Sequence, residues 1–175
     1  MRFAFVTMLL VSTLSTSMRT ARADTLSAIG GLSFGRNNGM NDLKAMNPLL
    51  GAEYTFDLVG RLKLGGFYDY TFLTDSNGNS GSLQFMGAVL RFDFANETSI
   101  GPFIDGKAGI GKREEGDQSS GARIAYGAGA GLRIPLSKTV SISPRFDIRY
   151  VPNAPDPSTG RQGLVDFGMM LSIHL

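Results

Sequence analysis

Apolar and polar residues alternate with a period of two along most of the chain after residue 24. Between residues 139 and 150, Val, Ile, Pro, Phe, Ile and Tyr take the even positions, while Thr, Ser, Ser, Arg, Asp and Arg take the odd ones. A period of two places successive side chains on opposite faces of a β-strand. The pattern therefore predicts strands that carry one apolar face and one charged face.

Eight such segments follow one another, separated by clusters of turn residues. We expect strands at residues 25–36, 48–58, 61–73, 82–95, 99–113, 121–135, 139–151 and 162–175. The connections alternate between long ones (37–47, 74–81, 114–120 and 152–161) and tight ones (59–60, 96–98 and 136–138). This rhythm predicts an all-β, eight-stranded antiparallel up-and-down barrel with both termini at one end. Pro102 and Pro144 lie inside predicted strands, and we expect a bulge near each.

The next question is which face of the barrel points inward. An eight-stranded barrel has a narrow interior that side chains nearly fill. The bulky, aromatic-rich apolar face would overpack it, whereas the charged face is diluted by Gly65, Gly127, Gly129 and Gly131. Charges of both signs can also pair across a closed lumen. We therefore predict a transmembrane barrel with its apolar face toward lipid; a soluble, lipocalin-like barrel with reversed faces is the alternative.

This orientation assigns two sets of residues. The inward charged set, with a structural or channel-lining role, is Glu53, Lys63, Asp69, Arg91, Asp105, Lys107, Arg133, Arg145, Asp147, Arg149 and Asp166. The lipid-facing aromatic girdle is Tyr54, Phe56, Tyr68, Tyr70, Phe72, Phe92, Phe94, Tyr126, Phe146 and Tyr150. A few apolar residues also fall on the inward face, namely Leu83, Phe85, Val89 and Phe103.

Residues 1–23 have the pattern of an export signal. Arg2 precedes an apolar run over residues 4–14, and Ala21-Arg22-Ala23 fits a small-x-small cleavage site before Asp24. We expect a signal peptide at 1–23 and one barrel domain at 24–175. Removal of the signal takes away three of the 17 Lys and Arg residues, so the 15 Asp and Glu residues then outnumber them. A nucleic-acid partner loses its compositional support.

The sequence contains few residues suited to catalysis or metal binding. It has no cysteine, which excludes a disulfide scaffold, a thiolate metal site and a cysteine nucleophile. His174 is the one histidine, and a lone histidine is more often structural than catalytic. Residues 75–80 begin like a calcium loop, but Ser80 stands at position six and Met86 at position twelve. We predict no enzyme and no cofactor or metal site.

The signal, the eight-strand meander, the alternating loop lengths and the final strand Val165-Asp166-Phe167-Gly168-Met169-Met170-Leu171-Ser172-Ile173-His174-Leu175 resemble the OmpA/OmpX-type outer-membrane barrels. The resemblance covers essentially all of residues 24–175. It implies a Gram-negative outer membrane, contact with outer-membrane lipid, insertion by the barrel-assembly machinery and a monomer. The family usually ends its last strand in an aromatic residue, whereas this chain ends in Leu175.

The predicted function is a structural or envelope-integrity role, or an interaction through the surface loops. The main alternative is a narrow passive, porin-like channel through the charged lumen. A loop-mediated adhesin and a soluble lipocalin-like binding barrel are further alternatives. The interior of a small barrel is filled by side chains, which argues against a wide pore.

Overall fold

The computed structural model describes residues 24–36, 46–74, 80–115, 118–119, 121–151 and 162–175. The strands in these residues pair antiparallel throughout. They are β1 (Asp24–Arg36), β2 (Met46–Val59), β3 (Leu62–Thr74), β4 (Ser80–Asp93), β5 (Gly101–Glu115), β6 (Gln118–Ser119), β7 (Arg123–Pro135), β8 (Val140–Val151) and β9 (Gln162–His174). The described residues contain no helix that is long and apolar enough to span a membrane.

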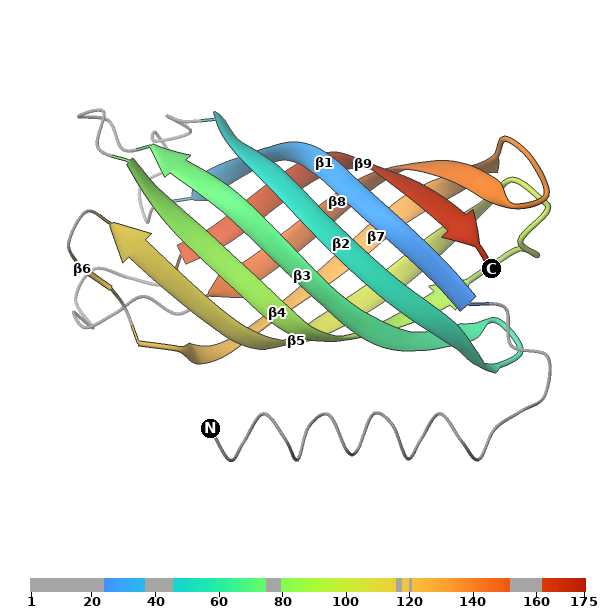
Figure 1. The fold of residues 1–175 in the computed structure, drawn as a ribbon, viewed down its shortest axis with the longest axis horizontal. Coiled ribbons are helices and arrows are strands. Elements are labelled where there is room, and N and C mark those ends of the chain that lie inside the picture. Colours follow the sequence, from blue (N-terminus) through green and yellow to red (C-terminus); the bar gives the residue numbers. More distant parts are fainter. Residues whose placement is uncertain (1–23, 37–45, 75–79, 116–117, 120, 152–161) are drawn as a thin grey trace.

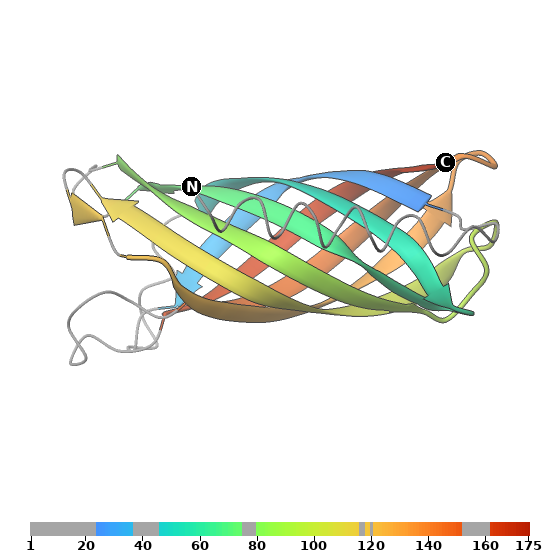
Figure 2. The ribbon, with the colours of Figure 1, turned by 60° about the horizontal axis from the view of Figure 1, so that its bottom comes forward.

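The eight long strands form one closed barrel. Their order is β4-β3-β2-β1-β9-β8-β7-β5, and the pairing of β4 with β5 closes the ring. The two-residue β6 pairs only with the last residues of β5. Figures 1 and 2 show the strands tilted around a common axis, as closure of an eight-stranded sheet requires.

The barrel has two different ends, which we call the turn end and the loop end (Figure 1). Residues 60–61, 94–100 and 136–139 connect strands at the turn end, where β1 begins and β9 finishes. The main-chain N–H of Leu175 donates to the carbonyl of Asp24 there, at 2.8 Å. The strands that the long connections were predicted to join end at the opposite, loop end. Most residues of those connections lie outside the described part of the chain, and so does the predicted signal segment 1–23.

The predicted strands are confirmed, and their ends differ from the observed ones by at most two residues. The expected bulges near Pro102 and Pro144 are wrong, because the register of β5 on β7 is unchanged across Pro102 and the registers of β8 on β7 and on β9 are unchanged across Pro144. A proline removes one ladder donor but inserts no residue, so it does not by itself shift a register. The register of β2 on β3 does shift, between Asp57 and Val59. This shift lies beside Gly60, whose φ of 60° suits the tight turn.

The polarity of the barrel is inverted relative to that of a water-soluble protein. Large apolar side chains such as Phe167 and Ile104 are 54% and 50% exposed on the outer surface. Charged side chains such as Glu53 and Arg149 are each 1% exposed and lie inside. The reversed, lipocalin-like arrangement is therefore wrong for this chain. Leu83, Phe85, Val89 and Phe103 are buried, as their strand positions predict.

Candidate functional site: the charged lumen

The predicted inward charges are all buried in the structure. With Asp93, which is buried too, the fully buried charges among the described residues are six cations and six carboxylates: Lys63, Arg91, Lys107, Arg133, Arg145 and Arg149 against Glu53, Asp69, Asp93, Asp105, Asp147 and Asp166. Removing a charge from water costs several kcal/mol, so each needs a partner of opposite sign. The equal numbers allow every charge to be compensated inside the barrel.

Two arginines form the centre of this network. The Arg91 guanidinium lies 2.6 Å from a Glu53 carboxylate oxygen and 3.4 Å from Asp105. Arg145 lies 3.6 Å from Glu53, 3.1 Å from Asp105 and 2.5 Å from Asp147. Five charges from β2, β4, β5 and β8 thus meet across the barrel axis. These ion pairs join opposite walls of the lumen, so they leave no wide passage through its centre.

An aromatic ring and a thioether lie between the two guanidinium groups. The Phe103 ring centroid is 4.5 Å from the Arg91 guanidinium carbon and 5.9 Å from that of Arg145. The Met170 sulfur lies 3.5 Å from a nitrogen of each arginine. Ile29 packs against the same two apolar residues. Because the face of an aromatic ring attracts cations, Phe103 stabilises the two guanidinium groups without a further carboxylate.

Small residues provide the room for these long side chains. A Cβ atom at Gly129 would overlap the carboxylates of Asp147 and Asp105, and one at Gly131 would overlap the Phe103 ring. These two glycines of β7 therefore provide the space that their sequence positions suggest. Replacing either would displace a buried carboxylate or an aromatic ring.

The loop-end half of the lumen contains an apolar group as well as buried charges. Leu83, Ala125 and Leu164 lie within the first four residues of β4, β7 and β9, which begin at that end. They pack with Phe67, Phe85 and Val89 into one buried group, which we call the loop-end plug. The Phe67 and Phe85 rings meet edge to face at 4.6 Å between centroids.

Two ion-pair groups flank the loop-end plug. Lys107 donates to Asp69 at 3.0 Å, and its ammonium lies 4.7 Å from the centroid of the Phe67 ring. Arg149 pairs with Asp166 and donates to the Thr71 hydroxyl at 2.9 Å. Both cations are fixed by their partners.

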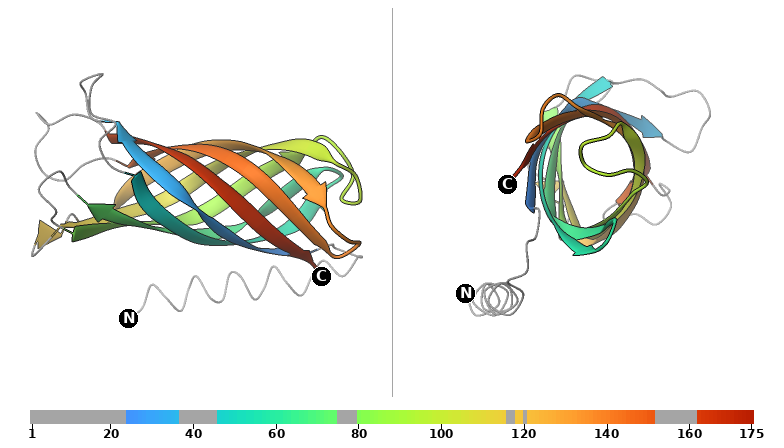
Figure 3. Two further views of the ribbon diagram at one scale, coloured as in Figure 1. Left: turned by 90° about the horizontal axis from the view of Figure 1, so that it is seen from above. Right: turned by 90° about the vertical axis from the view of Figure 1, so that its right-hand side faces the viewer.

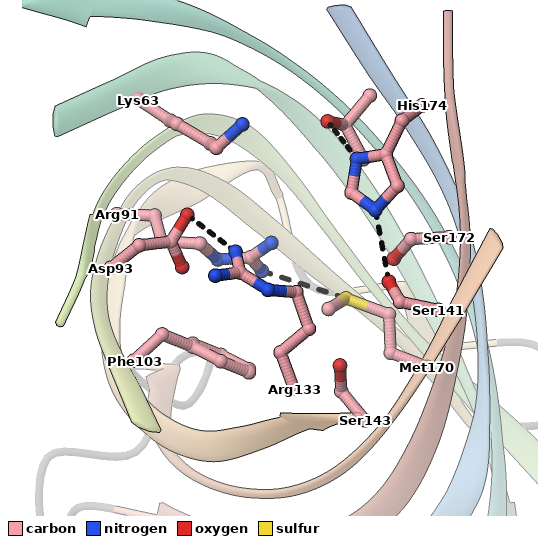
Figure 4. A pocket seen from close by; sticks show the side chains of 11 residues that line it. Lys63, Arg91, Asp93, Phe103, Arg133, Ser141, Ser143, Met170, Ser172 and His174 are labelled. Carbon is pink, nitrogen blue, oxygen red and sulfur yellow. Dashed lines mark hydrogen bonds and ion pairs between the residues drawn. The ribbon is translucent and has the colours of Figure 1, made fainter. Parts of the chain in front are cut away.

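The turn end is lined by charges and hydroxyl groups (Figure 4). Lys63 pairs with Asp57 at 2.8 Å and with Glu97, which lies in the 94–100 turn. Arg133 lies 2.9 Å from Asp93 and donates to the main-chain carbonyls of residues 95 and 96, at 2.8 Å each. The end-on view in Figure 3 shows this turn lying across the opening of the barrel, and these bonds hold it there.

His174 lies beside the same turn. Its Nδ1 is 3.2 Å from the Thr25 hydroxyl, and its Nε2 is 3.1 Å from the Ser141 hydroxyl. The Glu97 carboxylate is 3.7 Å from Nδ1. The ring is therefore anchored on both sides by hydrogen-bonding groups from β1 and β8.

A small cavity lies between these residues and the central arginines. Its lining is Thr25, Lys63, Arg91, Asp93, Phe103, Arg133, Ser141, Ser143, Met170, Ser172 and His174. The cavity volume is about 10 Å³, enough for one water-sized particle. No substrate with an acyl chain or a sugar ring fits into this space.

The predicted girdle residues all have outward positions, where they are exposed or half-buried. Tyr54, Phe56, Phe92 and Phe94 lie toward the turn end, and Tyr70, Phe72, Tyr126 and Tyr150 lie toward the loop end. Tyr68 and Phe146 lie near the middle of β3 and β8. Tyr126 and Tyr150 stack on neighbouring strands with their ring centroids 4.8 Å apart.

Sequence reasoning missed several members of the network. Glu97 falls in a predicted turn, and nothing in the alternation shows that its side chain reaches Lys63. Met170 is an inward position in the alternation, so its strand parity could have identified it. No group of three or more His, Cys, Asp or Glu side chains suited to a metal occurs in the described part of the chain, and residues 75–79 of the calcium-like loop lie outside that part.

Comparison with known proteins supports the fold. No protein-family model and no curated protein sequence matches the chain. Among solved structures, neisserial surface protein A is similar, with 12% identity, 89% of this chain and 100% of that chain covered, and a TM-score of 0.73. The outer membrane enzyme PagL is 21% identical, with 86% and 99% covered and a TM-score of 0.58. Ail, the attachment invasion locus protein of Yersinia pestis, is 18% identical, with 86% and 99% covered and a TM-score of 0.55.

Proposed function

We propose that this chain, which has the fold of the small eight-stranded outer-membrane barrels, is a monomeric protein of a bacterial outer membrane with a structural or surface-interaction role. Its closed, ion-paired interior inside an apolar exterior carries this proposal. Residues 1–23 would direct export, and the barrel-assembly machinery would insert the barrel. Outer-membrane lipid is then its main partner, and no nucleic acid is involved.

The outer surface supports a lipid environment. Leu50, Leu90, Ile148 and Leu171 belong to an exposed apolar set that occurs on all eight long strands. Soluble monomers rarely expose apolar patches larger than a few hundred Å². A closed barrel also leaves no unpaired strand edge in the membrane, where unpaired main-chain groups are costly. The aromatic residues toward each end would lie at the two membrane interfaces.

The interior argues against the passive channel. The Arg91 and Arg145 ion pairs connect opposite walls at the centre, and the loop-end plug fills the lumen toward the other end. A conducting path would have to break buried ion pairs and hydrate apolar side chains. Both steps are unfavourable, so we expect no steady ion current through the folded barrel.

The arrangement nearest to a catalytic one also favours a non-enzymatic role. Ser141, His174 and Glu97 follow one another in the order hydroxyl, imidazole and carboxylate. However, Ser141 is buried, and Thr25 lies closer to Nδ1 than Glu97 does. The adjoining cavity has room for one water-sized particle, not for an ester. We propose that these groups hold the turn end together.

The fold alone does not select a role, because one fold can host several functions. Solved structures similar to this one include an outer membrane enzyme and an attachment invasion locus protein. The loop end would be the surface that faces outward and the place where a specific interaction arises. Any such role would depend on the loop-end connections, most of whose residues lie outside the described part of the chain.

The first test combines location with conductance. Outer-membrane fractions are run on a denaturing gel with and without boiling, and the purified barrel is reconstituted in planar bilayers. We expect a heat-dependent mobility shift and no steady conductance. A soluble periplasmic protein without a shift would contradict the membrane proposal. A stable ion current would replace the structural role with the channel, and hydrolysis of envelope lipid by purified protein would replace it with an enzyme.

A further inference from the structure

The turn-end cavity is lined by hydrogen-bond donors that have no acceptor. Arg91 Nε, Arg133 Nε and the Ser143 hydroxyl are buried, and none has a hydrogen-bond partner among the residues that the structure describes. All three residues line the cavity. Buried polar groups nearly always find a partner in a folded protein. A ligand in this cavity would therefore be an acceptor.

The side chains that line the cavity directly include more cations than carboxylates. The lining contains the cations of Lys63, Arg91 and Arg133, and Asp93 is its one carboxylate. Asp93 is paired with an Nη atom of Arg133, which leaves the Nε–H of the same guanidinium unused. Glu53 and Asp105 contact Arg91 through an Nη atom, again leaving its Nε–H unused. Both guanidinium groups thus have an N–H free to bind an anion.

Size limits which anion can enter. A cavity of about 10 Å³ admits a single particle close to a water molecule in size. A halide ion, being a single atom, is the kind of anion nearest to this size, whereas phosphate, sulfate and carboxylate ligands have several heavy atoms and are larger. We propose that the cavity at the turn end is a binding site for one chloride-sized anion, held by Arg91 Nε, Arg133 Nε and Ser143.

Glu97 places a negative charge next to two residues that line this site. Its carboxylate lies at the turn end, paired with Lys63 and 3.7 Å from His174 Nδ1. It is 31% exposed, so it also contacts the solvent at the turn end. A fixed negative charge there repels an incoming anion and occupies Lys63. Removing that charge should strengthen binding.

The test uses the arginine side chains themselves as reporters. Isotope-labelled barrel, folded in detergent micelles, is titrated with chloride while the Nε–H resonances of its arginines are followed by NMR. We expect saturable shifts of the Arg91 and Arg133 signals. The Arg149 signal should stay still, because its Nε is bound to Asp166 at the loop end. Sulfate at matched ionic strength should leave all three unchanged.

Three variants sharpen the result. Ser143→Ala should weaken chloride binding about fivefold, as expected for one lost hydrogen bond. Ser33→Ala, a buried lumen serine beside Arg149, is the matched control and should leave the affinity unchanged. Glu97→Gln should tighten binding about threefold or more, through loss of the competing charge.

Several outcomes would overturn the proposal. Shifts that fail to saturate, or that appear equally at Arg149, would be a general effect of salt. An equal response to sulfate would contradict the size limit. The absence of any chloride response would mean that the cavity takes only water. Because the titration is made in detergent, these outcomes do not depend on where the protein resides in the cell.

Discussion

The loop-end half of the lumen contains the packed apolar side chains of Phe67, Leu83, Phe85 and Leu164 beside its ion pairs, whereas the turn-end half is filled mainly by ion pairs and hydroxyl groups. Both halves exclude bulk solvent, but they do so by different interactions. Apolar packing is non-directional, so each residue in the loop-end plug depends on the volume of its neighbours. Each charge in the other half depends on particular partner atoms.

The apolar plug and the ion-pair network should therefore differ in how well they tolerate substitutions. An apolar core accepts changes that keep hydrophobicity and approximate volume. A buried ion-pair network does not, because the loss of one partner leaves the others without compensation. We therefore expect the centre and turn end of the lumen to be the more sensitive region, although the loop-end plug is equally buried.

The largest effect is expected at Arg145. Arg145→Ala removes the cation that Glu53, Asp105 and Asp147 share, leaving Arg91 alone beside the first two, and should lower the free energy of unfolding by about 3–5 kcal/mol. Urea unfolding in phospholipid vesicles, followed by the mobility of unboiled samples, measures this loss. Exposed ion pairs contribute about 1 kcal/mol or less. A loss in that range for Arg145→Ala would show that water already solvates the three carboxylates.

A smaller effect is expected in the loop-end plug. Phe85→Leu keeps an apolar side chain but removes volume and the edge-to-face contact with Phe67, at a cost of about 1–2 kcal/mol. The same unfolding assay applies. If Phe85→Leu proved as destabilising as Arg145→Ala, the contrast between the two halves would be wrong.

At the rim of the turn end, His174→Ala removes hydrogen-bonding contacts to the hydroxyls of Thr25 and Ser141. We expect a cost of about 1 kcal/mol, because the site is only partly buried. Hydrogen exchange of the 136–139 turn should speed up, while exchange in β4 stays unchanged. Faster exchange throughout the barrel would place His174 in the central network instead.

The smallest effect is expected at an exposed ion pair. Lys112 and Glu114 lie 2.5 Å apart near the loop end, with more than a third of each side chain exposed. Lys112→Ala should change the unfolding free energy by roughly 0–1 kcal/mol, because solvent and salt screen such pairs. This variant is the control for Arg145→Ala. A cost near that of Arg145→Ala would mean that burial does not govern these ion pairs.

The strands and their faces could be predicted from the sequence alone. A side chain in a strand points to the face opposite that of its neighbour for reasons of local covalent geometry. Glu53, Arg145 and Arg149 could therefore be placed inside, and Tyr54 and Phe146 outside, without knowledge of the pairing. The errors were the bulges expected at two prolines and strand ends such as those beside residues 94–100, where no alternation marks the ends.

The partners of the inward charges were decided only by the tertiary structure. Arg145 meets Asp105 and Glu53 because closure of β4 on β5 brings β8, β5 and β2 around one axis. Alternation gives the face of each side chain, but not its height or its neighbour across the lumen. The contact of Glu97 with Lys63 and His174 depends on how the 94–100 turn folds over the opening. The cavity beside Ser143 arises in the same way, because its walls come from strands far apart in the sequence.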